Sequence, residues 1–310
     1  NSIFNPAQAK RIFSLLTLSA IIGSIFGSQT SSLIVSFTSI TTVNLIFVCI
    51  ALLLLSTILI AFLPANGGEK SDSHSASRRR EQKEAKSKRS AIKTVLKSEY
   101  QLLIAAIVGL TMIATTLTDY QFKVLSVEAY PDTESLTAFM GTFYAGISIV
   151  SLLLQTLFSS GIIKKFGVAG AILTRPVGMM VGAVLMVIEP VLASVILLNG
   201  FDRSTRYSID KTGRELLFLP LSQSVKKRTK VVIDLFVDRF ARGLSGGVLL
   251  IILLFADNPL TIISYTLLGI LVCWILIGYK ARAEYINTFR NSLQRRMVDP
   301  DSIELNLNEP

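Results

Sequence analysis

Charged residues recur at helical spacing inside one apolar segment of this chain, residues 191–220. Asp202, Arg206, Asp210 and Arg214 follow one another at intervals of four. Residues four apart lie on one face of a helix, so this segment predicts a stripe of charges of alternating sign. Charges within a membrane-spanning helix are costly unless they are paired or hydrated. The stripe therefore indicates either a structural ion-pair ladder or a site that handles a charged ligand.

The next apolar segment, residues 232–256, carries a second charged group that contains Asp238 and Arg242. If the two segments run in opposite directions, depth alone allows Arg206 to pair with Asp238, and Asp202 with Arg242. The structural interpretation is a ladder between adjacent helices. The functional interpretation is an anion-binding site with gating or coupling pairs. The candidate anion contacts are Arg175, Arg203, Arg206, Arg239 and Arg242, and the candidate gating or coupling residues are Asp119, Asp202 and Asp238.

Two of these candidates stand apart from the stripe. Arg175 lies near the middle of segment 168–188 and is followed by Pro176, which removes a helix hydrogen bond. An arginine beside a kink suits a bidentate grip on phosphate or carboxylate, and the alternative is an arginine that binds a carbonyl freed by the proline. Asp119 and Lys123 are four apart, which favours an interfacial pair between them.

Several other chemistries are excluded by residue types. His74 is the only histidine, and Cys49 and Cys273 lie inside apolar runs, so neither a metal site nor a disulfide scaffold is expected. No phosphate-binding G-x-x-x-x-G-K-[ST] loop and no nucleophile–base pair is visible, so we expect neither an enzyme nor a cofactor. The net charge of +10 is concentrated between apolar runs, which argues against nucleic acid as a partner.

The elements that must position the charged residues are membrane spans. Hydrophobic residues make up 51% of the chain and the mean hydropathy is +0.56, which favours an all-α, polytopic membrane protein. Every second loop is basic, so both ends of the chain are expected on the cytoplasmic side of the membrane. We expect this membrane to be a bacterial inner membrane. Small-residue pairs, such as Gly23 with Gly27 and Gly243 with Gly247, predict close helix packing. The expected spans are 12–37, 41–63, 101–121, 137–159, 168–188, 191–220, 232–256 and 260–279.

A long polar linker divides these spans into a set of two and a set of six. We expect residues 1–63 to hold the last two spans of an N-terminal half and residues 64–97 to form a basic cytoplasmic linker. Residues 98–280 then form a six-span C-terminal half, and 281–310 a cytoplasmic tail that leads into a further domain. The first residue is not methionine, so we expect the chain to be a fragment. A long linker between two sets of spans is typical of a six-plus-six plan, so we expect a twelve-span protein of which eight spans are present.

Four stretches resemble the nucleotide transporter (ATP/ADP translocase) family of plastids and intracellular bacteria. The most specific is RYSIDKTGRELLFLPLS at 206–222, followed by VVIDLFVDRFARGLSGG at 231–247. TLTDYQFKVLSVEAYPDTESLTAFMG at 116–141 resembles the segment after the family's seventh span, and NSIFNPAQAKRIFSLL at 1–16 the stretch before its fifth. Together the resemblance extends over nearly all of residues 1–280.

The resemblance implies a major-facilitator-like bundle that exchanges ATP, ADP or related nucleotides by alternating access, as a monomer in the lipid bilayer. Asp119 stands where the family carries a functional glutamate, and Leu244 where it carries a lysine. Arg175 stands where a neutral threonine is usual, so we expect it to replace the missing cation as a phosphate contact. Two alternatives stay open: a major-facilitator-type transporter of another organic anion or solute, and a non-transporting receptor or scaffold.

Overall fold

The structure is a computed structural model that describes residues 6–37, 44–62, 95 and 98–298. These described residues form helices joined by short turns, which agrees with the predicted all-α class. The chain divides into two compact units. One unit comprises residues 1–76 and 126–153, and the other residues 77–125 and 154–310.

The described residues of the first unit lie mainly in α1 (Pro6–Phe37), α2 (Leu45–Ala61) and α5 (Thr133–Leu153). Helix α1 packs along α5, and small residues allow the approach. A Cβ atom added to Gly141 would lie 2.7 Å from the carbonyl oxygen of Ser28, and the Ser32 hydroxyl donates to the carbonyl of Ala138 at 2.9 Å. The predicted close packing at Gly23 and Gly27 is not found, because a Cβ at either position meets no described atom within 4 Å.

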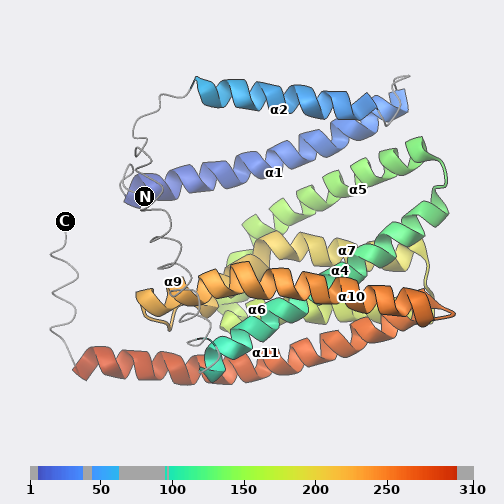
Figure 1. The fold of residues 1–310 in the computed structure, drawn as a ribbon. Helices are drawn as coiled ribbons and strands as arrows, with labels where there is room; N and C mark the ends of the chain where they lie inside the picture. Colours follow the sequence, from blue (N-terminus) through green and yellow to red (C-terminus); the bar gives the residue numbers. More distant parts are fainter. Residues whose placement is uncertain (1–5, 38–43, 63–94, 96–97, 299–310) are drawn as a thin grey trace, which may run out of the picture. The chain divides into compact units, whose positions relative to one another are not determined.

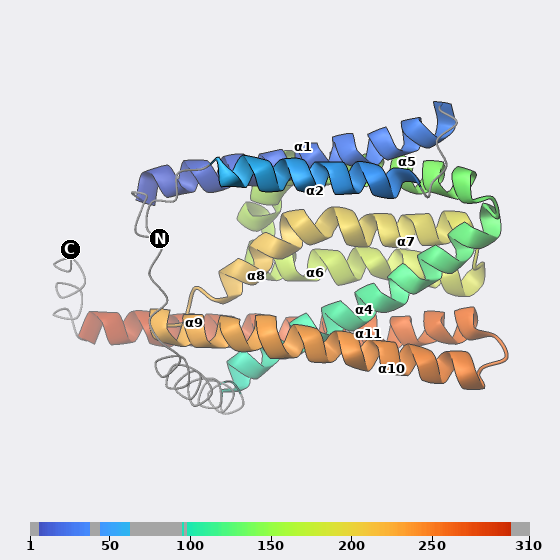
Figure 2. The same ribbon diagram turned by 45° about the horizontal axis from the view of Figure 1, so that its top comes forward.

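The second unit contains the charged segments and is organised around one helix, α6 (Ser159–Ile188). Helix α6 packs against α7 on one side and α11 on another, and Figure 2 shows α6 and α7 side by side. The other elements are α4 (Glu99–Ala129, shared at its end with the first unit), η2 (Leu154–Phe158), α7 (Leu192–Thr205), η3 (Arg206–Asp210), α8 (Lys211–Leu217), α9 (Gln223–Val232), η4 (Ile233–Val237), α10 (Asp238–Phe255) and α11 (Pro259–Val298).

The two charged segments are interrupted helices. Segment 191–220 consists of α7, the π-helical turn η3 and α8, and segment 232–256 begins at a second π-helical turn, η4, before α10. π-helical turns inside α-helices are frequent at functional sites. Helix α6 is also broken, because Gly167 adopts a positive φ of 66° that suits a residue without a Cβ. The regular part of α6 therefore starts close to the predicted boundary at residue 168.

Four of the described helices are long and apolar enough to cross a membrane. They are Glu99–Ala129, Thr133–Leu157, Gly167–Ile188 and Pro259–Arg290, and Leu45–Leu59 is a shorter apolar helix. The count of eight spans stays a prediction. Linker 64–97 lies almost entirely outside the described residues, whereas the first part of the predicted tail continues α11 as far as Val298 (Figure 1).

Helices α6 and α7 are in close contact at two glycines that were not predicted as packing residues, Gly178 and Gly182. A Cβ on Gly178 would collide with the ring of Phe201, and a Cβ on Gly182 would lie 2.7 Å from the Cα of Leu198. The spacing of four places both glycines on one face of α6, which is the small-residue packing known from membrane helices. This contact brings the residues of α7 next to Arg175.

We expect Gly182→Ala to destabilise the protein by about 1–3 kcal/mol, because the new methyl group meets backbone that cannot rotate away. The matched control is Gly247→Ala in α10, where a Cβ meets no described atom within 4 Å. We expect that change to stay within about 0.5 kcal/mol of the parent protein. Thermal unfolding of the two variants in detergent measures the difference, and equal unfolding midpoints would contradict the close α6–α7 contact.

Candidate functional site

A buried arginine occupies the centre of the second unit. The Arg175 side chain on α6 is only 1% exposed. Its Nε and Nη2 atoms donate to Oδ1 of Asp202 at 2.9 and 2.6 Å, and Nη1 donates to Oδ2 of Asp210 at 2.8 Å. Both carboxylates are buried as well. Arg175 is therefore neither isolated nor bound to a carbonyl freed by Pro176, but forms two buried ion pairs that join α6 to α7 and η3.

Two further helices complete the environment of this guanidinium. Arg175 Nη2 also donates to the hydroxyl of Thr115 on α4 at 2.9 Å. On α11, the ring of Trp274 lies under the guanidinium, with its centroid 5.6 Å from Cζ. A cation over an aromatic face is stabilised by the ring quadrupole. Arg175 is thus enclosed by α4, α7, η3 and α11, and each donor that it uses is directed at a protein atom.

The predicted stripe of alternating charges is confirmed along α7, η3 and α8. Arg206 Nη2 binds Oδ2 of Asp202 at 2.5 Å, and Arg214 Nη2 binds Oδ2 of Asp210 at 3.1 Å. Each aspartate consequently lies between two arginines, with Arg175 on the buried side. The cluster of these five side chains holds three cations and two anions, a net charge of +1.

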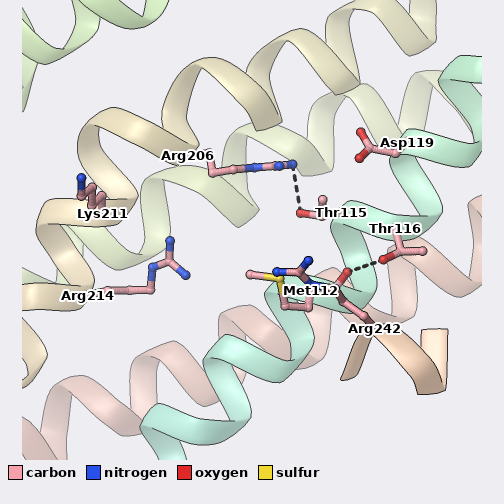
Figure 3. A pocket seen from close by; sticks show the side chains of 8 residues that line it. All are labelled: Met112, Thr115, Thr116, Asp119, Arg206, Lys211, Arg214 and Arg242. Atoms are coloured by element: carbon pink, nitrogen blue, oxygen red, sulfur yellow. Dashed lines mark hydrogen bonds between the residues drawn. The ribbon is translucent and has the colours of Figure 1, made fainter. Parts of the chain in front are cut away.

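An open cavity of about 530 Å³ lies next to this cluster (Figure 3). Figure 3 shows Arg206 and Arg214 extending toward α4, with Arg242 below and Asp119 above. The lining residues are Met112, Thr115, Thr116, Asp119, Arg206, Lys211, Arg214 and Arg242. Four of these eight side chains are cationic and one is anionic. Such a lining favours an anion that carries several negative charges.

Asp119 is held by α7 and does not follow the predicted pairing with Lys123. Its Oδ1 atom accepts hydrogen bonds from Nδ2 of Asn199 and from Nη2 of Arg203, both at 2.9 Å. Arg203 also donates through Nε to the side-chain oxygen of Asn199 at 2.8 Å. The three side chains form a closed polar group at the edge of the cavity.

A smaller cavity of about 190 Å³ shares Lys211 and Arg214 with the first one. Its rim includes Glu215 and Lys230, which form an ion pair of 2.5 Å between α8 and α9. Asp238 also lines it. Lys211 and Arg214 therefore line both the large and the small cavity.

The depth-based pairings between the two charged segments are not found. Arg206 pairs with Asp202 and Arg242 pairs with Asp238, in each case one turn away on the same run of helix. Depth along the membrane normal does not fix how a helix is rotated about its axis, and Arg242 of α10 lines the same cavity as Arg206 without a pairing between the two charged segments. Asp238 and Arg242 form an ion pair of 2.6 Å in which Arg242 is exposed and Asp238 is half-buried.

The structure brings only some of the predicted site residues to the large cavity. Arg206, Arg242 and Asp119 line it, whereas Arg239 is exposed on α10 and lies outside the lining. Leu244, where the family carries a lysine, is 48% exposed and also lies outside it.

Several residues of the site were not selected from the sequence. Lys211 and Arg214 line the cavity, Thr115 and Asn199 hold charged side chains, and Trp274 supports Arg175. Arg214 was visible as a member of the stripe, and Lys211 as a charged residue inside the family-like motif. In the described part of the chain, no group of His, Cys, Asp and Glu side chains is arranged to hold a metal ion.

The chain is similar to known nucleotide carrier proteins. The model of the family described as TLC ATP/ADP transporter matches residues 1–285. "ADP,ATP carrier protein 1" of Chlamydia muridarum is 25% identical over 211 residues, covering 60% of this chain and 40% of that protein. "ADP,ATP carrier protein 2, chloroplastic" of Arabidopsis thaliana is 25% identical over 242 residues, covering 69% and 38%.

"ADP,ATP carrier protein 5" of Rickettsia prowazekii is 23% identical over 223 residues, covering 63% of this chain and 44% of that protein. The matched parts thus amount to less than half the length of each of these three relatives. No solved structure gives a significant match.

Proposed function

Because this chain belongs to the TLC ATP/ADP transporter family, we propose that it is part of a secondary transporter that exchanges nucleotides such as ATP and ADP across a membrane. The relatives named as ADP,ATP carriers support this assignment. The structural observation that carries the proposal is the cavity with four cationic side chains and a single carboxylate. Nothing in the proposal requires a covalent step, so the protein acts by binding and conformational change.

The lining suits a phosphate chain on physical grounds. A polyphosphate brings several negative charges into a partly desolvated site, and fixed cations must replace the screening of water. A volume of about 530 Å³ falls within the range of ligand-sized pockets. Arginine binds two phosphate oxygens at once, whereas lysine acts as a point charge. We assign the phosphate contacts to Arg206, Lys211, Arg214 and Arg242.

The other candidate residues take different roles in this proposal. Arg203 is engaged by Asp119 and serves the gating group, and Arg239 remains a candidate contact in another conformation. Asp119, Asp202 and Asp238 each hold an arginine, namely Arg203, Arg206 and Arg242. An anion that binds Arg206 or Arg242 competes with Asp202 or Asp238, so substrate arrival weakens an ion pair within one run of helix. This exchange of partners provides the gating and coupling step.

The membrane arrangement belongs to the same proposal. We infer a major-facilitator-like bundle of twelve spans, of which this chain contributes eight, with residues 98–280 as the six-span half. Both ends of the chain and linker 64–97 then face the cytoplasm of a bacterial cell. The four apolar helices and the alternation of basic loops support this topology. The protein works as a monomer in the bilayer, with ATP or a related nucleotide as its ligand.

Exchange can be measured directly with the full-length protein in liposomes. We expect uptake of labelled ATP to rise severalfold when the vesicles contain unlabelled ADP, because an antiporter moves one nucleotide inward for each one outward. Unlabelled nucleotides compete, whereas citrate or sulfate at the same concentration does not. Uptake that needs no internal nucleotide would refute exchange and show nucleotide uniport. Uptake that citrate abolishes would support a transporter of another organic anion.

A further inference from the structure

We propose that Arg175 is a positioning residue, which offsets one of the two negative charges of Asp202 and Asp210 from the buried side, so that the cavity arginines keep a surplus of one positive charge that attracts an anion. The inference rests on the proposed anion transport and deepens it, since it assigns a role to a buried cation that lies behind the cavity lining. It also replaces the expectation that Arg175 is itself a phosphate contact.

Burial separates Arg175 from the cations of the cavity. Its side chain is 1% exposed, whereas those of Arg206 and Arg214 are 18% and 23% exposed and line the cavity. The donors of Arg175 are directed at two carboxylates and the Thr115 hydroxyl, and the Trp274 ring covers the guanidinium. An anion in the cavity therefore meets Arg206 and Arg214 while Arg175 stays behind the aspartates.

The hydrogen bonds to the individual carboxylate oxygens show how Asp202 and Asp210 are shared between Arg175 and the cavity arginines. On Asp202, Oδ1 accepts from Arg175 and Oδ2 accepts from Arg206. On Asp210, Oδ2 is shared by Arg175 at 2.8 Å and Arg214 at 3.1 Å, so the buried arginine has the shorter contact. Arg175 thus offsets one of the two carboxylate charges from behind, and the other is shared between Arg206 and Arg214.

Charge balance gives the consequence. With Arg175 present, the five-residue cluster has a net charge of +1, and this surplus lies on the side of the cavity. Without Arg175, two buried carboxylates face two arginines and the surplus disappears. Interactions between charges are strong where water is excluded, so the carboxylates would bind Arg206 and Arg214 as full counterions.

Arg206 shows that it has unused capacity for a ligand. Its Nη2 atom binds Asp202 and lies 3.4 Å from the Thr115 hydroxyl, whereas its buried Nε atom has no hydrogen-bond partner among the described residues. A buried guanidinium nitrogen without a partner is costly, and the side chain that carries it lines the cavity. The surplus charge and the unsatisfied donor thus occur on the same side chain.

The test compares binding of ATP, ADP and AMP to the full-length protein and to charge-balanced variants. We expect Arg175→Gln to weaken ATP binding about tenfold or more, with a smaller effect for AMP, because the lost attraction scales with ligand charge. We expect the double variant Arg175→Gln/Asp202→Asn, which removes one charge of each sign, to bind ATP within about threefold of the wild type. If Arg175 instead bound the phosphate directly, removing Asp202 would not restore ATP binding to the Arg175→Gln variant.

Each remaining outcome is decisive. If Arg175→Gln does not fold, ATP binding by the double variant Arg175→Gln/Asp202→Asn is still compared with that of the wild type and tests the inference. Arg175→Gln/Asp210→Asn provides a second variant in which one charge of each sign is removed. A folded double variant that binds ATP more than tenfold more weakly overturns the inference, and so does failure of both double variants to fold. A wild type that binds no nucleotide refutes the proposed substrate instead, and pyrophosphate then serves as the probe for the same comparison. If the wild type binds neither ligand, both proposals fail.

Discussion

Asp202→Ala is expected to lower the free energy of unfolding by about 3–5 kcal/mol, whereas Asp238→Ala lowers it by less than about 1 kcal/mol. Each aspartate binds the arginine four residues later, at 2.5 Å for Asp202 and 2.6 Å for Asp238. The two pairs differ in burial. Asp202 is fully buried and also carries two hydrogen bonds from Arg175, whereas Arg242, the partner of Asp238, is 64% exposed.

The physical reason is the charge left behind. Removal of Asp202 leaves Arg175 buried with one carboxylate, Asp210, which it shares with Arg214. Removal of Asp238 leaves Arg242 in contact with solvent. Thermal unfolding of both purified variants in the same detergent measures the difference, together with the yield of folded protein. Similar unfolding midpoints for the two variants would show that the cluster around Arg175 does not hold α6 to α7.

The helical class and the position of most helices could be predicted from the sequence, because apolar runs of membrane-spanning length bounded by charged loops form helices in nearly all cases. The regular part of α6 begins at residue 167, one residue from the predicted 168. The π-helical turns η3 and η4 could not be predicted, since a single extra residue in a turn hardly changes the apolar pattern. The close contact at Gly178 and Gly182 was also missed, because a glycine pair in one helix does not identify its neighbour.

The candidate site was predictable where the relevant geometry is local. The alternating stripe follows from helical periodicity, and the ion pairs of Arg206 with Asp202 and of Arg214 with Asp210 confirm it. Contacts between helices depend on rotation about each axis, which neither spacing nor depth determines. That is why Arg175 was expected to contact phosphate and instead lies between two aspartates, with Trp274 beneath it.

Lys211→Gln is expected to weaken ATP binding by roughly 10- to 100-fold, which corresponds to loss of about 1.5–3 kcal/mol from one charge-assisted hydrogen bond. Of the four cavity cations, Arg206, Arg214 and Arg242 each neutralise part of their charge against an aspartate. Lys211 is exposed, lines the cavity and forms no ion pair with the described residues. Its full charge is therefore available to a phosphate group, and its removal leaves no carboxylate without a partner.

The matched control is Lys227→Gln, which removes an exposed lysine of α9 that lies outside the cavity lining. We expect this control to bind ATP as the parent protein does, and both variants to keep the parent unfolding midpoint. The loss for Lys211→Gln should grow from AMP to ATP, because a point charge acts on the whole phosphate chain at short range. If both lysine variants weaken binding equally, general surface charge attracts the nucleotide. If neither does, the phosphates do not bind beside α8, and the cavity between α4, α8 and α10 is not the substrate site.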